Sequence, residues 1–269
     1  MRKPRLLDLF CGAGGAAMGY HQAGFDDIVG VDNRPMPRYP FTFVQADALE
    51  YLAEHGHEFD AIHASPPCQG YSIMNNLPWL KGRDYPLLIL PTMEMLEGLG
   101  KPYALENVMG ARYGAKGLTK RGLEAHGLKA GWLCGGMFGV PFYRHRLFAT
   151  SFFWLAPGHP KHKGVIRKGP PDPALPVPPG SFDKWRASGD PMAALMGKMA
   201  TLGKWQNGNG AQATGVGVGH AKGWRLAAKA MGIDWMNRAE LSQAIPPAYT
   251  QFIGRRLLAY IRAKEGVSA

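Results

Sequence analysis

Short apolar runs alternate with helix-forming segments over residues 5–151, and this alternation constrains the fold more than any other feature of the chain. Such an order is typical of a parallel sheet whose strands are joined by crossover helices. The expected strands are Arg5–Phe10, Ile28–Asp32, Thr42–Gln45, Ala61–Ser65, Tyr103–Asn107 and Arg146–Phe152. The expected helices between them are Gly15–Ala23, Ala48–Glu54, Pro86–Leu99 and Thr119–Leu128.

The composition changes beyond this pattern. Residues 157–180 are rich in proline and lysine, and residues 207–219 are rich in glycine, so neither stretch suits a regular helix or a central strand. Helical character returns at Trp224, and Pro246 and Pro247 are placed to open a last helix that runs to about Lys264. We therefore expect an α/β core over residues 1–154, a small loop-rich region over 155–222, and helices over 223–269 that complete the core.

The charge of the chain favours a polyanionic partner. The formal net charge is +11, and lysine and arginine gain affinity by neutralising phosphates and releasing counterions. Solubility alone is the alternative explanation of this charge. At 46% hydrophobic residues the composition also provides enough apolar side chains for a buried core, which excludes disorder as the main state.

The cysteines predict neither disulfides nor a metal site. Cys11, Cys68 and Cys134 are odd in number, lie far apart and show no Cys or His ligand spacing, which fits a reducing cytosol. No apolar stretch reaches the roughly 18 residues of a membrane span, and the basic start leads into a strand rather than a signal peptide. We expect a cytoplasmic protein, without metal or membrane association.

A glycine-rich loop follows the first expected strand. Gly12, Ala13, Gly14 and Gly15 allow a tight turn there and bring backbone amides close to a ligand at the start of a helix. The spacing is not that of a G-x-G-x-x-G loop, which disfavours a nicotinamide or flavin cofactor and leaves other nucleotides open.

Three side chains beside this loop each have two interpretations that the sequence leaves open. Asp32, followed by Asn33, accepts hydrogen bonds from ribose hydroxyls or closes a turn. Asp47 bonds an adenine amino group or caps the helix that begins at Ala48, and both roles can coexist. Phe10 lies against the adenine or in the core.

The segment Pro66–Gln69 places a thiol on a stiff loop directly after an expected strand. A free cysteine is more often a small buried hydrophobe than a nucleophile, so Cys68 alone is ambiguous. Two further segments change this balance, because Glu106–Val108 ends another expected strand and Arg144–Arg146 opens the last one. Glu106 lies at the end of a strand that is expected to be buried. An ion-paired glutamate on the protein surface is therefore a poor explanation of this residue.

With the glycine loop, Pro66–Gln69, Glu106–Val108 and Arg144–Arg146 in this order, the chain resembles the DNA cytosine carbon-5 methyltransferase family over residues 5–151 and a C-terminal piece. The resemblance implies a Rossmann-like methyltransferase core with a mixed, mostly parallel sheet, S-adenosyl-L-methionine as methyl donor, and cytosine in duplex DNA as acceptor. Methylation of cytosine in transfer RNA, or a catalytically inactive DNA-binding relative, are the alternatives.

The resemblance also implies the roles of individual residues. Cys68 would add to carbon 6 of a flipped-out cytosine, and Glu106 would protonate or hydrogen-bond ring N3. Arg146, together with Arg144, would contact the base O2, with contacts to phosphates as the alternative. The expected cofactor contacts are Phe10, Gly12, Ala13, Gly14, Gly15, Asp32, Asn33, Asp47, Ala48 and Pro66.

Contacts to DNA are expected from two regions. The stretch of residues 69–80 resembles the mobile lid of the family and supplies Gln69, Tyr71, Ser72, Asn75 and Asn76. The region 155–222 corresponds to the target-recognition region and supplies Lys204, Gln206, Asn209, Gln212 and Thr214. A solvated lysine face with tryptophans packed on the core explains its composition nearly as well. As a short recognition region, it predicts a target between a dinucleotide and a tetranucleotide.

The chain departs from the family pattern in three places. Phe142 stands where a glutamine is usual, no arginine-containing ninth motif is visible, and the last motif, Gln243–Tyr249, lacks its customary Gly-Asn. The modest size and the missing motif suggest a viral or mobile-element origin. We expect a monomer, and the sequence does not identify a cognate restriction enzyme.

Overall fold

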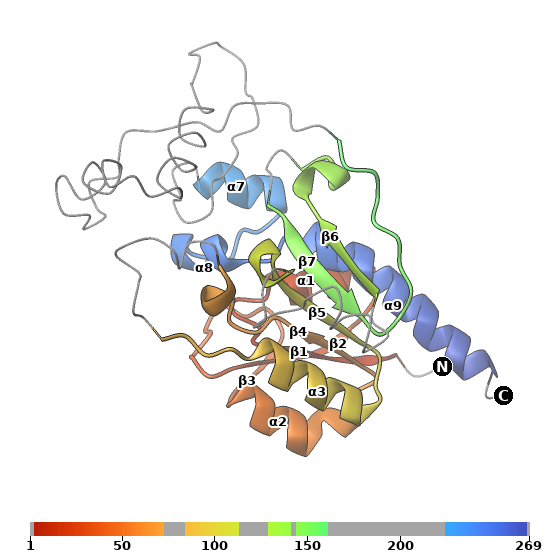
Figure 1. Cartoon of the computed structure of the whole chain (residues 1–269). Coiled ribbons are helices and arrows are strands. Elements are labelled where there is room, and N and C mark those ends of the chain that lie inside the picture. The colour runs from red at the N-terminus through yellow and green to blue at the C-terminus, as the bar shows by residue number, and fades with distance from the viewer. Residues whose placement is uncertain (1–2, 73–83, 113–128, 141–143, 161–223, 268–269) are drawn as a thin grey trace, which may run out of the picture.

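The computed structural model describes residues 3–72, 84–112, 129–140, 144–160 and 224–267 (Figure 1). Within these residues the strands form one seven-stranded sheet in the order β3-β2-β1-β4-β5-β7-β6. The strands are β1 (Arg5–Leu9), β2 (Asp27–Asp32), β3 (Thr42–Gln45), β4 (Ala61–Ala64), β5 (Tyr103–Val108), β6 (Lys129–Leu133) and β7 (Arg146–Thr150). The first five strands run parallel, and β7 is antiparallel to both β5 and β6. This confirms the predicted α/β fold with a mixed, mostly parallel sheet.

The alternation of side chains along the strands divides the core into two layers. Leu7 and Leu9 of β1 face one layer, whereas Leu6 faces the other, because successive residues of a strand point to opposite faces. Helices α2 (Ala48–His55) and α3 (Ile89–Leu99) cover the first face. Helices α1 (Gly15–Ala23) and α9 (Pro247–Val267) cover the second, so the sheet is enclosed on both sides (Figure 1).

Helix α1 packs against α9 at very short range. A Cβ atom on Gly19 would lie 2.2 Å from the carbonyl oxygen of Pro247, so only glycine permits this approach. The hydroxyl of Thr250 donates to the carbonyl of Ala16 at 2.9 Å. Helix α9 is therefore part of the core and lies close to α1, the helix that follows the glycine loop.

Two shorter helices, α7 (Trp224–Met231) and α8 (Arg238–Gln243), precede α9. Apolar side chains of this segment, among them Met236 and Leu241, form a third cluster with Ala13 of the glycine loop. None of the described helices combines the length and the apolar character needed to cross a membrane.

Within the described residues, the sequence predicts most strands and helices to within a few residues, but it misses strand β6 and gives no separate bounds for α7 and α8. The strand Thr42–Gln45 and the helix Gly15–Ala23 have the predicted bounds. Strand β6 was not predicted. It lies at the sheet edge, its first residues are exposed, and Gly131 at its centre weakens the strand pattern. The helix expected over 119–128 and most of the region 155–222 lie outside the described residues, and the proposed domain boundaries stay predictions.

Candidate active site

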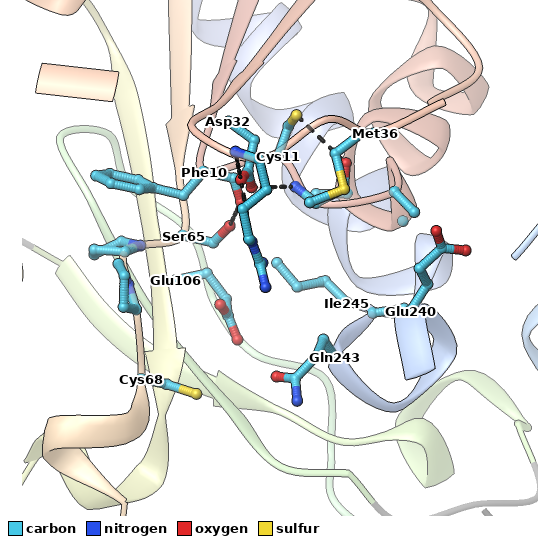
Figure 2. Close-up of a pocket in the computed structure, with 18 of the residues that line it drawn as sticks. Phe10, Cys11, Asp32, Met36, Ser65, Cys68, Glu106, Glu240, Gln243 and Ile245 are labelled. Carbon is cyan, nitrogen blue, oxygen red and sulfur yellow. Dashed lines mark hydrogen bonds and ion pairs between the residues drawn. The ribbon is translucent and has the colours of Figure 1, made fainter. Parts of the chain in front are cut away.

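A cavity of about 550 Å³ opens at the carboxyl ends of the central strands, where ligands of open α/β sheets bind (Figure 2). Its volume is in the usual range of small-molecule sites. The predicted cofactor contacts that line it are Phe10, Gly12, Ala13, Gly15, Asp32, Asn33, Asp47, Ala48 and Pro66. The predicted catalytic and DNA contacts that line it are Cys68, Glu106, Arg146 and Gln69. Segments far apart in the sequence thus meet at one cavity.

The glycine loop takes a left-handed path as it leaves β1. Phe10 has φ +56° and Gly12 has φ +51°, and a left-handed non-glycine residue costs about 1–2 kcal/mol. Such strain is concentrated at functional sites. The Ser65 hydroxyl donates to the carbonyl of Phe10 at 3.2 Å, and the Trp235 indole N–H donates to the carbonyl of Ala13 at 2.7 Å. These contacts from β4 and the C-terminal segment hold the loop in place.

Gly12 and Gly14 serve this loop differently. A Cβ atom on Gly12 would meet nothing within 4 Å, so that residue borders open space. A Cβ atom on Gly14 would lie 2.6 Å from Pro40, and Gly14 is absent from the cavity lining. The structure therefore gives Gly14 a packing role, and its contact to a cofactor stays a prediction.

The two aspartates at strand ends have different hydrogen-bond partners. Asp32 accepts from the backbone N–H of Gly12 and of Arg34, each at 3.1 Å, and its carboxylate borders the cavity. Asp47 accepts from the N–H of Leu49 at 2.8 Å and of Glu50 at 3.1 Å, which makes it the N-cap of α2. The capping role of Asp47 is thus present, and the contacts of both residues to a nucleoside stay predictions.

Cys68, Glu106 and Arg146 come together although they lie on three different segments. Cys68 follows β4, Glu106 lies on β5, and Arg146 begins β7. The antiparallel register pairs Val108 with Arg146, which brings Arg146 Nε to 2.9 Å from Glu106 Oε1. Figure 2 shows that Cys68 and Glu106 point into the same cavity.

The ion pair with Arg146 does not give the Glu106 carboxyl group a hydrogen bond. Although Arg146 Nε is close, Oε1 is buried and accepts no hydrogen bond from any described residue. Burial raises the pKa of Glu106 to about 7, and the neighbouring arginines counteract only part of this effect. A buried carboxyl group that holds its proton near neutral pH can donate it to a ligand.

The electrostatics of Cys68 depend on the same pair. Burial raises the pKa of the Cys68 thiol, the Glu106 carboxylate raises it further, and Arg146 and Arg144 lower it. Protonation of Glu106 therefore favours ionisation of Cys68. A protonated Glu106 and an ionised Cys68 therefore favour each other.

Asn107 is a residue of the site whose role was not predicted. Its side-chain N–H donates to the carbonyl of Pro66 at 2.9 Å, and its Oδ1 accepts from the N–H of Val108 at 2.9 Å. Asn107 is 1% exposed. Its occurrence next to Glu106 in the motif was the available signal, but only the fold shows that it holds the loop that carries Cys68.

Arg144 and Tyr71 are placed differently from expectation. Arg144 donates to the carbonyls of Leu241 and Ala244, its own carbonyl accepts from the Tyr249 hydroxyl at 2.5 Å, and it is absent from the cavity lining. These contacts attach it to the C-terminal segment, and its contact to a base stays a prediction.

Tyr71 is 8% exposed and packs in the core, where its hydroxyl accepts from the N–H of Ile89 at 3.1 Å. It therefore supports the start of α3 rather than facing DNA. Ser72 is half-buried at the end of this stretch. The other predicted DNA contacts, and Phe142, lie outside the described residues: Asn75, Asn76, Lys204, Gln206, Asn209, Gln212 and Thr214.

The C-terminal segment supplies one wall of the cavity, which fits the pocket-closing role of the last motif in the family. Gln243 of that motif lines the cavity, and Glu240 of α8, which was not predicted, lines it as well. Glu240 closes a capping box with Asn237, which the Asn-x-x-Glu spacing could have indicated.

Glu240 also pairs with the guanidinium of Arg38 through two hydrogen bonds of 2.8 and 2.9 Å. No sequence signal predicts that pair, because its members are 202 residues apart.

Comparison with known proteins identifies the chain. The model of the C-5 cytosine-specific DNA methylase family matches residues 4–153. The chain belongs to this family. Within the family, it is 29% identical over 214 residues to the type II methyltransferase M.XorII of Xanthomonas oryzae, a match that covers 71% of this chain and 47% of that protein. It is 30% identical over 182 residues to the type II methyltransferase M.AquIA of Picosynechococcus, covering 55% of this chain and 71% of that protein.

The chain thus spans about half the length of M.XorII. Among solved structures, a putative DNA modification methyltransferase encoded within an E. coli prophage superposes with a TM-score of 0.56 at 16% identity, over 97% of this chain and 100% of the other. The methyltransferase EhMeth of Entamoeba histolytica superposes with a TM-score of 0.51 at 13% identity, over 98% and 99%. At such low identity these two structures support the fold alone, and they agree with the Rossmann-like sheet of this methylase family member.

Proposed function

We propose that the protein transfers a methyl group from S-adenosyl-L-methionine to carbon 5 of cytosine in DNA, through a covalent bond between Cys68 and carbon 6 of the base. One observation carries the proposal: Cys68, Glu106 and Arg146 border the same cavity as the glycine loop and Asp32. A nucleophile, an acid and a cation are thus available to one ligand beside a candidate nucleotide site. Membership of the cytosine-specific methylase family supports this assignment.

The described residues fit the proposed methyl donor. The open space beside Gly12 admits a ligand close to the backbone, and Asp32 offers carboxylate oxygens at the end of β2. Phe10 and Asp47 border the same part of the cavity and would contact the nucleoside. When bound, S-adenosyl-L-methionine supplies an electrophilic methyl group on a sulfonium.

Cys68 is the proposed nucleophile. Carbon 5 of cytosine reacts poorly with electrophiles, and addition of a thiolate at carbon 6 makes it enamine-like. Sγ forms a bond to carbon 6, the electron pair of the 5,6 double bond moves toward N3, and N3 takes a proton from Glu106. Carbon 5 would then take the methyl group as the bond between that group and the sulfonium sulfur breaks, which leaves S-adenosyl-L-homocysteine. Loss of the carbon-5 proton to a base, release of Sγ and return of the N3 proton to Glu106 complete the cycle.

Glu106 and Arg146 would support this addition in different ways. Because burial raises the pKa of Glu106 to about 7, a large fraction of the side chains carries the proton at neutral pH. Arg146 lowers the pKa of the Cys68 thiol and stays close to Glu106 when the carboxylate forms. Its guanidinium would stabilise the negative charge that develops on the base.

The target cytosine must leave the duplex to reach Cys68. The thiol is only partly exposed and faces a cavity, so a stacked base in a helix cannot contact it. The net charge of +11 would favour the approach of DNA. The region 155–222 would read a short target, which bisulfite sequencing of treated DNA can measure.

Covalent trapping tests the proposed function. A duplex that contains 5-fluorocytosine retains the adduct, because fluorine cannot leave as the carbon-5 proton does. Incubation with the full-length protein and S-adenosyl-L-methionine should give a denaturation-resistant complex, and mass spectrometry should locate the attachment at Cys68. Cys68→Ala should give none. Unmodified duplex is the control, and a fluorinated transfer RNA run in parallel tests the RNA alternative. An adduct that persists in Cys68→Ala would overturn the mechanism.

A further inference from the structure

A cluster of metal-ligating side chains lies outside the cavity. One ligand atom each of Cys134, His145 and His159 lie within 4.8 Å of one another. Cys134 is buried, His145 is half-buried and His159 is exposed, so the cluster extends from the core to the surface. The three residues are far apart in the sequence, so the spacing of cysteines and histidines did not predict a metal site.

The sheet register creates this cluster. Leu133, the last residue of β6, pairs with Arg146, the first residue of β7. Cys134 follows β6 and His145 precedes β7, so the antiparallel pairing brings these two residues to the same end of the ribbon.

The chain beyond β7 returns to the same place with His159. Phe152 and Trp154 are buried, and a Cβ atom on Gly131 would lie 2.8 Å from the Trp154 ring. Packing against β6 therefore directs the segment after β7 back along the sheet edge, and the His159 ring lies 4.7 Å from the ring of Trp132 on β6. The His145 ring lies 5.1 Å from that same indole. One tryptophan thus holds both imidazoles beside the sulfur.

We propose that Cys134, His145 and His159 bind a divalent zinc ion. One thiolate and two imidazoles form a sulfur and nitrogen donor set that suits Zn²⁺ and disfavours the oxygen-seeking Mg²⁺ and Ca²⁺. Water or another ligand would complete a tetrahedral shell.

The cluster needs a small adjustment to close on a metal. Bond lengths of about 2.0–2.3 Å in a tetrahedral site place neighbouring ligand atoms about 3.5 Å apart. The present spread of up to 4.8 Å exceeds this by about an ångström. A rotation of the exposed His159 side chain, with its ring repositioned against Trp132, would supply that movement.

The ion would serve a structural purpose. It would join the ends of β6 and β7 to the segment that leads from the sheet toward residues 161–223. It would also fix His145, whose carbonyl accepts from Arg146 Nη1 at 3.0 Å. The zinc site goes beyond the proposed function and does not depend on methyl transfer.

Cobalt titration of the reduced, metal-free, full-length protein tests the site. Co²⁺ bound by a thiolate in a tetrahedral shell gives a sulfur-to-metal charge-transfer band and intense visible bands. We expect both at one equivalent, and we expect Zn²⁺ to remove them by displacement. Cys68→Ala should keep the charge-transfer band, whereas Cys134→Ala should lose it.

The exposed His159 keeps the test valid if Cys134→Ala fails to fold. His159→Ala should weaken Co²⁺ binding by at least about 10-fold, whereas His57→Ala, which also removes an exposed histidine, should leave it unchanged. Zn²⁺ should raise the Tm of the parent protein and of His57→Ala more than that of His159→Ala. Absence of the charge-transfer band, or equal affinity in His159→Ala, would overturn the proposal.

Discussion

The side-chain amide of Asn107 donates to the carbonyl of Pro66 at 2.9 Å and so ties the end of β5 to the loop that carries Cys68. Its oxygen accepts from the N–H of Val108, which fixes the orientation of the amide. Because Glu106 precedes Asn107 on the same strand, this contact sets the position of the proposed nucleophile relative to the proposed acid. Asn107 is thus a positioning residue.

Loss of this contact should slow the covalent step. Asn107→Ala leaves the Pro66 carbonyl and the Val108 N–H without their partner, at a cost of about 1–3 kcal/mol in unfolding free energy. The rate of fluorocytosine trapping should fall by about 10- to 100-fold, since a displacement of about an ångström has effects of this size. Asn107→Asp keeps the acceptor for Val108 but not the donor for Pro66, and it should also trap slowly. Trapping at the parental rate by a folded Asn107→Ala would contradict the positioning role.

Removal of the Glu106 charge should lower the pKa of the Cys68 thiol. The carboxylate raises that pKa, so Glu106→Gln favours the thiolate at a given pH. The pH profile of Cys68 alkylation by iodoacetamide should therefore shift to lower pH. Site-resolved mass spectrometry separates Cys68 from the buried Cys11 and Cys134. A shift to higher pH would contradict the electrostatic coupling.

Removal of the Arg146 charge should have the opposite effect. Arg146 lowers the pKa of the Cys68 thiol, so Arg146→Gln should move the alkylation profile to higher pH. The Glu106 carboxyl also loses its ion-pair partner, and its pKa should rise further above about 7. Arg34→Gln, which removes an exposed arginine of the same cavity, serves as the matched control. Identical profiles for the parent protein and Arg146→Gln would refute this prediction.

The indole of Trp235 should contribute to cofactor binding through the glycine loop. Trp235→Phe removes the N–H that donates to the carbonyl of Ala13 and retains an aromatic ring. We expect a loss of about 1 kcal/mol in unfolding free energy, and weaker binding of S-adenosyl-L-homocysteine by a few-fold. Isothermal titration calorimetry measures the affinity. Unchanged affinity at reduced stability would restrict Trp235 to a packing role.

Asp8 should make the stability of the protein depend on pH. The side chain is fully buried on β1 beneath the glycine loop, and burial raises its pKa from 3.8 to about 7, while the Tyr39 hydroxyl opposes this effect. The folded state therefore binds the proton more tightly, so stability is greatest below about pH 4 for this group and declines as the pH rises to about 7.

Asp8→Asn should remove that decline. The difference in unfolding free energy, variant minus parent, should increase by about 1 kcal/mol per pH unit between pH 5 and 7. Above pH 7 this difference should level off. Urea denaturation at several pH values measures both curves. Parallel curves would show that Asp8 is charged, or equally protonated, in both states.

The sequence was sufficient where structure depends on near neighbours. Apolar alternation and turn residues determined strands such as Thr42–Gln45, and a loop that follows a parallel strand must lie at its carboxyl end. For that reason the segments around Gly12, Cys68 and Glu106 could be assigned to one edge of the sheet. Edge strand β6 was missed, because Gly131 at its centre and the exposed residues at its start weaken the strand pattern.

The amino-acid sequence by itself thus determined the fold class, the family resemblance and the residues able to carry the chemistry. The tertiary structure decided which of them meet: it attached Arg144 to the C-terminal segment, buried Tyr71, joined Asn107 to Pro66 and gathered Cys134 with His145 and His159. The physical reason is that strand register and close packing bring together residues that are far apart along the chain, and no local pattern records that proximity.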